Sequence, residues 1–175
     1  MEHYFITKGS GQSNLNCSKN ETTSYDDALV HAGIGNINVV LLSSMIPPKA
    51  SEINPINLQW GDIIHCIMAR NDGKKGKIIS CALLISEIYH GSKLLGSFVL
   101  EYSGHGNEKV AQKNLFLDLV DMIRRRGYGN VPTLKMYSQH TTQNGYTILP
   151  KKFIYNRQKV EKRYGTVVCT ICFVK

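Results

Sequence analysis

The 175-residue chain is 42% hydrophobic and 9% aromatic, and it carries a formal net charge of +8. This length suits one domain with a sizeable core, and the ordinary composition excludes disordered, repetitive and low-complexity proteins. No run approaches the roughly 20 apolar residues that cross a bilayer, and the first residues lack the pattern of a secretory signal. We therefore expect a single domain over residues 1–175, located in the cytoplasm and without a membrane partner.

Cationic residues are dispersed along the chain, and three groups of them stand out. They are Lys74, Lys75 and Lys77; Arg124, Arg125 and Arg126; and Lys151, Lys152, Arg157, Lys159, Lys162 and Arg163. Turns and helix ends accommodate positive charge at little cost, so we interpret these groups as solvated surface. A nucleic-acid patch is the alternative, and the dispersal of the groups along the sequence does not favour it.

Cysteine and histidine spacing indicates no metal site. The five cysteines are an odd number without the spacing of a disulfide framework, and we predict buried thiols. They are Cys17, Cys66, Cys81, Cys169 and Cys172. Cys169 and Cys172 fall in a predicted strand, where residues three apart point to opposite faces and cannot bind one ion together. The six histidines are dispersed, so we expect no metal cofactor.

The beginning of the chain predicts a strand, a loop and a helix. Residues 3–7 are typical of a short strand, and the Gly, Ser and Asn content of residues 9–23 indicates a loop. Ser24 is the expected N-cap of a helix of about three turns at most, with Asp26 and Asp27 in its first turn.

A buried strand is predicted over residues 37–42, where an apolar, β-branched run follows two glycines. It leads into Ser43 and Ser44, and Pro47 and Pro48 end the extended pairing. A serine pair at a strand end is by itself typical of a turn.

Three further strands are predicted in the middle of the chain, over residues 62–70, 77–88 and 94–102. Residues 71–73 read Asn-Asp-Gly, which is strong hairpin-turn chemistry. The first two of these strands are therefore expected to form a hairpin.

In the last third of the chain, a long helix is predicted over residues 107–126. Its apolar residues recur every 3.6 positions, and the cations in its last turn favour a helix C-terminus there. Strands are expected over residues 133–140 and 165–174, with an Asn-Gly turn at 144–145, and residues 146–159 fit no single class. The order of elements predicts an α+β fold with mostly antiparallel sheets and two covering helices.

Three segments carry the functional signal. Residues 32–50 read Ala-Gly-Ile-Gly-Asn-Ile-Asn-Val-Val-Leu-Leu-Ser-Ser-Met-Ile-Pro-Pro-Lys-Ala, with Tyr25-Asp26 before them and Leu-Glu-Tyr-Ser-Gly at 100–104. The sequence has no Gly-x-Ser-x-Gly elbow, phosphate-binding glycine loop or His-Glu-x-x-His helix. The three segments together resemble the pyruvoyl-dependent arginine decarboxylase family. The likeness extends to residues 4–11, 139–141 and 160–162, and residues 142–159 are interpreted as a hairpin insertion.

The resemblance implies that Ser44 becomes a pyruvoyl cofactor when the chain cuts itself between Ser43 and Ser44. Residues 1–43 would form the β chain and residues 44–175 the α chain. The family's fold is a four-layer αββα sandwich, assembled as a homotrimer that can pair with a second trimer, with active sites between subunits. The implied reaction converts L-arginine to agmatine and carbon dioxide, and it needs a cofactor because no ordinary side chain provides the required electron sink.

Three more residues acquire roles from the same resemblance. Asn38 would donate a hydrogen bond to the oxyanion during cleavage, Glu101 would protonate the substrate Cα, and Asp26 would bind the guanidinium group. Each has a simpler interpretation: Asn38 satisfies a turn, Glu101 faces solvent at a strand end, and Asp26 interacts with the helix dipole.

Two other functions stay open. A pyruvoyl decarboxylase could act on another amino acid, because only Asp26 argues for a guanidinium group. A non-catalytic relative could instead use the +8 charge to bind RNA or an acidic protein.

Overall fold

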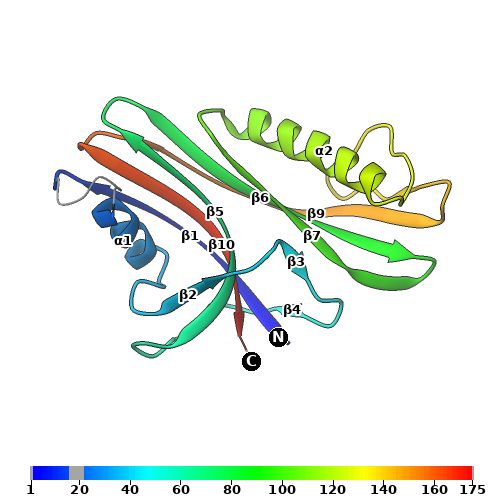
Figure 1. Cartoon of the computed structure of the whole chain (residues 1–175), viewed down its shortest axis with the longest axis horizontal. Helices are drawn as coiled ribbons and strands as arrows, with labels where there is room; N and C mark the ends of the chain where they lie inside the picture. Colours follow the sequence, from blue (N-terminus) through cyan, green and yellow to red (C-terminus); the bar gives the residue numbers. More distant parts are fainter. Residues whose placement is uncertain (1, 16–21, 175) are drawn as a thin grey trace.

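The computed structural model describes residues 2–15 and 22–174, and in these residues two stacked sheets of five strands each lie between two helices (Figure 1). The elements in chain order are β1 (His3–Ser13), α1 (Thr22–His31), β2 (Asn38–Leu41), β3 (Met45–Ile46), β4 (Ser51–Glu52), β5 (Ile63–Lys74), β6 (Ile78–His90), β7 (Lys93–Gly104), α2 (Glu108–Arg125), β8 (His140–Thr141), β9 (Tyr146–Lys159) and β10 (Tyr164–Val174).

The two sheets differ in how their strands follow the chain. The first has the order β2-β5-β10-β1-β4, and the second has the order β3-β7-β6-β9-β8. Pairing is antiparallel except for the short parallel pairs β2 with β5 and β1 with β4. The pairing of His3 with Val174 brings the two ends of the described chain together (Figure 1).

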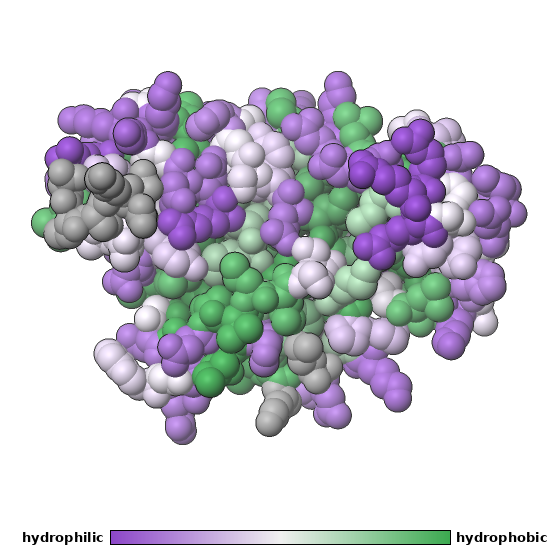
Figure 2. Space-filling model, in the orientation of Figure 1, coloured by the Kyte–Doolittle hydropathy of each residue, from purple (hydrophilic) through white to green (hydrophobic). Residues whose placement is uncertain are grey.

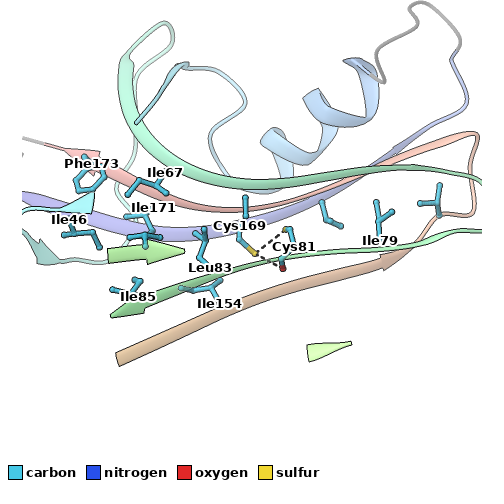
Figure 3. Packing of buried hydrophobic residues seen from close by; sticks show 14 residues of the cluster. Ile46, Ile67, Ile79, Cys81, Leu83, Ile85, Ile154, Cys169, Ile171 and Phe173 are labelled. Carbon is cyan, nitrogen blue, oxygen red and sulfur yellow. Dashed lines mark hydrogen bonds between the residues drawn. The ribbon is translucent and has the colours of Figure 1, made fainter. Parts of the chain in front are cut away.

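Three apolar cores separate four layers. The core between α1 and the first sheet contains Phe5, Ala28, Ala32, Ile34, Ile64, Cys66, Val168 and Cys172. The central core between the sheets includes Ile67, Ile79, Cys81, Leu83, Ile85, Val167, Cys169 and Ile171 (Figure 3). The core under α2 includes Ala82, Leu84, Leu100, Leu115, Leu119 and Ile148. Alternating side chains of β6 and β10 thus serve two cores each, and the predicted α+β fold with four αββα layers is confirmed.

The described cysteines are buried thiols, as predicted. Cys169 faces the central core and Cys172 faces α1, so the two cannot share an ion. The Cys169 and Cys81 sulfurs lie 3.6 Å apart across the central core (Figure 3). Cys17 lies outside the described residues. Within residues 2–15 and 22–174, no three His, Cys, Asp or Glu side chains are grouped so as to hold a metal.

Strand β1 is longer than predicted and runs to Ser13, so it includes residues 9–13 of the expected loop over residues 9–23. Residues 16–21 of that expected loop lie outside the described residues. Two glycines are the reason for the longer strand. A Cβ atom on Gly9 would lie 2.0 Å from the Ala28 carbonyl oxygen, and one on Gly11 would lie 2.2 Å from that of Ser24. The glycines therefore let α1 pack directly against an extended strand, and they do not mark a loop.

The predicted N-cap of α1 is also wrong. Ser24 is the third residue of the helix and is buried, and its hydroxyl shares a 2.9 Å hydrogen bond with that of Thr166 on β10. Asp26 and Asp27 consequently lie beyond the first turn. The Ser24 hydroxyl therefore ties the helix to the sheet, whereas the sequence suggested that it caps the start of the helix.

The expected hairpin at residues 71–73 does not form. Strand β5 continues to Lys74, the chain turns at Gly76 with φ +85°, and β6 then enters the other sheet. The turn-favouring side chains make distant contacts instead. Asn71 Nδ2 donates to Gly104 O at 2.5 Å, and Asp72 Oδ1 accepts from the Thr166 hydroxyl at 2.6 Å.

Two predictions near the C-terminus differ from the structure: an expected strand is mostly absent, and a segment that fitted no class is a strand. Of the strand expected over residues 133–140, only His140 belongs to a strand, at the start of β8. Residues 146–159 form the long strand β9, which pairs with β6 from Ile78↔Lys159 to His90↔Tyr146. The interpreted insertion is therefore a full strand of the second sheet, entered through the predicted turn at Gly145.

Helix α2 agrees with its prediction. The Asn107 side chain caps it by accepting a hydrogen bond from the Val110 N–H at 3.1 Å, and Gly127 follows its end with φ +75°. Its buried side chains are Ala111, Leu115, Leu119 and Ile123. Neither described helix has the length and apolar character needed to cross a membrane.

Candidate functional site

The Ser43–Ser44 segment is the point where the chain passes from one sheet to the other. Strand β2 belongs to the first sheet and β3 to the second. The Leu42 N–H donates to Cys66 O at 2.9 Å, and the Ser44 carbonyl accepts from the Val99 N–H at 2.9 Å. The connecting residues are thus fixed to a different sheet on each side.

The backbone at Ser44 is strained. Its φ is +21°, one of two positive values found at non-glycine residues in the described chain, and its N–H donates to Leu42 O at 3.3 Å in a tight turn. Such conformations cost on the order of 1–3 kcal/mol and persist only where surrounding structure imposes them. Here the attachments to both sheets impose it.

Glu101 lies directly beside this strained residue. It stands on β7 opposite Leu83, and its carboxylate accepts a short hydrogen bond from the Ser44 hydroxyl. The structure therefore unites two predicted site residues that are 57 positions apart.

Burial is the main reason that the pKa of the Cys66 thiol is raised to about 12, and the nearby Cys172 and Glu101 contribute to the rise.

Asn38 occupies the first position of β2, at the other end of this short strand from the serines. Its Nδ2 donates to Gly61 O at 2.9 Å, and its N–H donates to Asp62 O at 2.7 Å. In this arrangement the side chain satisfies the turn before β5, which is the simpler of its two interpretations. The role of Asn38 in cleavage stays a prediction.

Asp26 and Asp27 are both exposed on α1, but they differ in their partners. Asp27 Oδ2 accepts from the Gln12 N–H at 2.9 Å and so ties the helix to β1. Asp26 makes no hydrogen bond or ion pair with another described residue, and none joins it to Ser44 or Glu101. Its carboxylate is thus free to bind a ligand.

Gly96 positions β3 and was not singled out from the sequence. Its φ is +141°, and a Cβ atom there would lie 2.8 Å from Ile46 O, so only glycine lets β7 approach β3 this closely. A glycine inside the strand expected over residues 94–102 was the available signal. Through the pairs Met45↔Phe98 and Ile46↔Ser97, this contact sets the position of the residue that follows Ser44.

An exposed apolar patch adjoins the serine pair. We define it as Val40, Leu41, Met45 and Ile63, which lie on β2, β3 and the start of β5. Leu41 is 66% exposed and Ile63 71%. Figure 2 shows hydrophobic surface over this end of β2 and β5. Neighbouring apolar side chains this exposed are typical of a surface that another molecule covers.

Fold and site together define an αββα domain in which a strained serine, held between two sheets, meets a carboxylate. Comparison with known families shows which family has this sequence pattern. The pyruvoyl-dependent arginine decarboxylase family model matches residues 3–175, and the chain belongs to that family of enzymes. The match runs through residues 142–159, so it includes strand β9.

Individual relatives are more distant. The pyruvoyl-dependent arginine decarboxylase of Methanococcus vannielii is 27% identical over 128 residues, which cover 73% of this chain and 77% of the relative. The protein of the same name from Thermococcus sibiricus is 32% identical over 108 residues, or 60% of this chain and 66% of the relative. The one from Methanocaldococcus jannaschii is 33% identical over 101 residues, or 56% and 60%.

Proposed function

We propose that this protein converts L-arginine to agmatine and carbon dioxide, using a pyruvoyl group that forms from Ser44 when the chain cuts itself. The observation that carries the proposal is the Ser44 hydroxyl, which donates to Glu101 while its own backbone is strained. The name of the matching family supplies the substrate class.

Cleavage rearranges the peptide bond between Ser43 and Ser44. Ser44 Oγ attacks the Ser43 carbonyl carbon, the C–N bond breaks, and the acyl group moves to oxygen as an ester. Elimination then breaks the Cβ–Oγ bond and leaves a carboxylate on Ser43 at the end of residues 1–43. One water converts the remaining enamine to a ketone and releases one ammonia, so residues 44–175 begin with the pyruvoyl group.

The contact with Glu101 fits this chemistry. A carboxylate that accepts the hydroxyl proton makes Oγ a better nucleophile, and a strained peptide loses its strain when the bond breaks. Asn38 would stabilise the oxyanion only after its amide leaves Gly61 O.

The same residues fit the decarboxylation. The ketone of a pyruvoyl group supplies an electron sink for the pair of electrons left when carbon dioxide departs. Glu101, beside position 44, would hold the proton that the substrate Cα receives. Asp26 would bind the guanidinium group through charge-assisted hydrogen bonds, which its free carboxylate supports.

Assembly into a homotrimer, and association of two trimers, complete the proposal. The apolar patch beside Ser44 supports an interface there, because its side chains are exposed in the single chain. Such an interface would let Asp26 of one copy reach Ser44 of another. Sedimentation of the protein and of a Leu41→Asp variant tests the assembly: a trimer that the substitution breaks supports it, and a monomeric parent protein contradicts it.

Intact-mass spectrometry under denaturing conditions tests the proposed function first. We expect two fragments that meet at Ser44, the larger with a ketone at its N-terminus, and agmatine release on incubation with arginine. An uncut chain in fresh and aged samples would refute the cofactor. Correct cleavage without agmatine, but with decarboxylation of another amino acid, would refute only the substrate.

A further inference from the structure

Two turns with unusually high positive charge lie together at one end of the sandwich. They follow β5 and β9, at the upper left of Figure 1, where Figure 2 shows hydrophilic surface. We define the basic pole by the exposed cations of these turns, which are Lys74, Lys75, Lys77, Lys159, Lys162 and Arg163. These cations form two groups that are far apart in the sequence. The fold brings the two groups together into one surface.

Backbone hydrogen bonds hold the two turns against each other. The Lys75 N–H donates to Arg163 O at 3.2 Å, and the Gly76 N–H donates to Val160 O at 2.8 Å. In the other direction, the Val160 N–H donates to Lys77 O at 2.8 Å. The six cations therefore extend from a fixed backbone platform, which concentrates their charge in one place.

The charge of the pole is poorly compensated. The ion pairs within residues 2–15 and 22–174 involve none of its six cations. Glu161 is the single carboxylate in the two turns, and Lys162 Nζ makes a long 3.5 Å hydrogen bond to Gln12 O. Like charges held this close repel one another, so the platform has a cost in stability that an anionic partner would remove.

The pole does not belong to the site at Ser44. Cys66 and Lys74 are eight residues apart on β5, which places the pole roughly 26 Å from the strand position beside the serine crossover. Arginine and agmatine are cations, so this positive surface would slow their approach and cannot serve to attract them. Its charge requires another explanation.

We infer that the basic pole binds the phosphate backbone of single-stranded RNA without reading its sequence. Protein interfaces depend on buried aromatic or apolar anchors, whereas phosphate binding requires only cations. The large exposed apolar residues next to the pole are Leu15 and Ile78, which offer too little apolar area for the centre of a protein interface. A surface whose exposed side chains are mostly Lys and Arg matches a partner whose surface is made of phosphates.

Fluorescence anisotropy with a labelled RNA strand of mixed sequence tests this inference, using the purified full protein across a salt series. The pole variant is Lys75→Gln, Lys162→Gln and Arg163→Gln combined. The control variant is Lys109→Gln, Lys113→Gln and Lys135→Gln, which removes the same charge from exposed positions on α2 and the loop after it. Both variants should have the circular dichroism spectrum and the thermal stability of the parent protein, which shows that they fold.

We expect salt-dependent binding by the parent protein, weakened on the order of tens-fold by the pole variant and far less by the control variant. The slope of log affinity against log salt should fall by about 0.7 for each phosphate contact removed. Equal losses in the two variants would overturn the inference, as would the absence of RNA binding at low salt. Pole-dependent binding to anionic lipid vesicles but not to RNA would also overturn it.

Discussion

Glu101 and Asp26 are both exposed carboxylates, yet their surroundings give them different tasks. The Glu101 carboxylate accepts a hydrogen bond from the Ser44 hydroxyl, whose oxygen is the nucleophile in the proposed cleavage. Asp26 projects from α1 without a partner among the described residues, although its neighbour Asp27 is tied to β1. The two acids can therefore be tested by different measurements.

Replacement of Glu101 by Gln should slow both self-cleavage and agmatine formation, each by about 100-fold or more, because the amide neither accepts nor returns a proton efficiently. Gel analysis of freshly purified protein measures cleavage, and product release measures decarboxylation. Glu108→Gln, at the exposed start of α2, is the control and should behave like the parent protein. Normal cleavage in Glu101→Gln would show that the Ser44 contact has no chemical role.

The Asp26→Asn variant should raise the KM for arginine by about 10- to 100-fold, because it removes charge-assisted hydrogen bonds of about 1.5–3 kcal/mol. Cleavage and thermal stability should stay close to those of the parent protein. Asp27→Asn, on the same helix, should do the reverse: a small loss of stability from the weakened Gln12 contact, with KM unchanged. An unchanged KM in Asp26→Asn would assign the guanidinium to another residue.

At the scale of elements, close backbone approach decides where the reactive peptide lies. Strand β3 has only two residues, and its close packing against β7 depends on Gly96. A Cβ atom on Gly96 would lie 2.8 Å from Ile46 O. The crossover at Ser44 is anchored through this pair of strands. A methyl group at this position should therefore affect the chemistry more than the fold.

Gly96→Ala should shift β3 and slow cleavage on the order of 100-fold, as misplacement of about 1 Å does in catalytic sites. Circular dichroism should remain that of a folded protein. Gly91→Ala is the matched control, since Gly91 also has a positive φ of +58° but lies in open space. If both variants are cleaved equally slowly, the effect comes from backbone strain in general, and the close contact with Ile46 is not its cause.

Local sequence patterns correctly predicted the elements that are stabilised by contacts between residues close together in the sequence. Helix α2 has its cap at Asn107, its apolar periodicity and its glycine stop in the sequence, and all three are found. Predictions failed where distant contacts use a residue that normally marks a turn. Gly11 serves the packing of α1, and Asn71 bonds to Gly104 O 33 positions away. Sequence spacing carries no information about such partners.

The site was predictable to a similar degree. Motif resemblance identified Ser44 and Glu101, and the fold brings them into contact. It could not show that Ser44 links two sheets or that Gly96 seats the neighbouring strand, because both follow from the order of strands in space. The basic pole was missed for the same reason, since its two turns are distant in the sequence.

At the scale of the whole molecule, the layers keep ionisable thiols away from water. Cys66 and Cys172 face each other on β5 and β10 beneath α1. Burial raises the pKa of each thiol from its ordinary 9.0 to about 12. Thiols that stay protonated in the folded state, but ionise in the unfolded state, make stability depend on pH.

The free energy of unfolding should fall as pH rises from 9.0 towards about 12, because the unfolded thiols lose protons there while the folded ones keep theirs. Each thiol adds at most about 1.4 kcal/mol per pH unit to this fall. Denaturant unfolding below and within this range measures it. Cys66→Ala combined with Cys172→Ala should flatten the dependence, while Val168→Ala, a cavity in the same core, should leave it unchanged. Parallel curves for all three proteins would contradict the prediction.

Strand β1 lies inside the first sheet, between β10 and β4, and residues 1–43 also contain α1 and β2. After the proposed cleavage, no covalent bond joins these elements to the strands around them, so global unfolding becomes dissociation into two chains. Recovery then depends on the dilution of the sample, because the short chain must find the long one again. The intact precursor can refold at any concentration, so the molecule has to complete its fold before it is cut, and a mature copy that unfolds in dilute solution is lost.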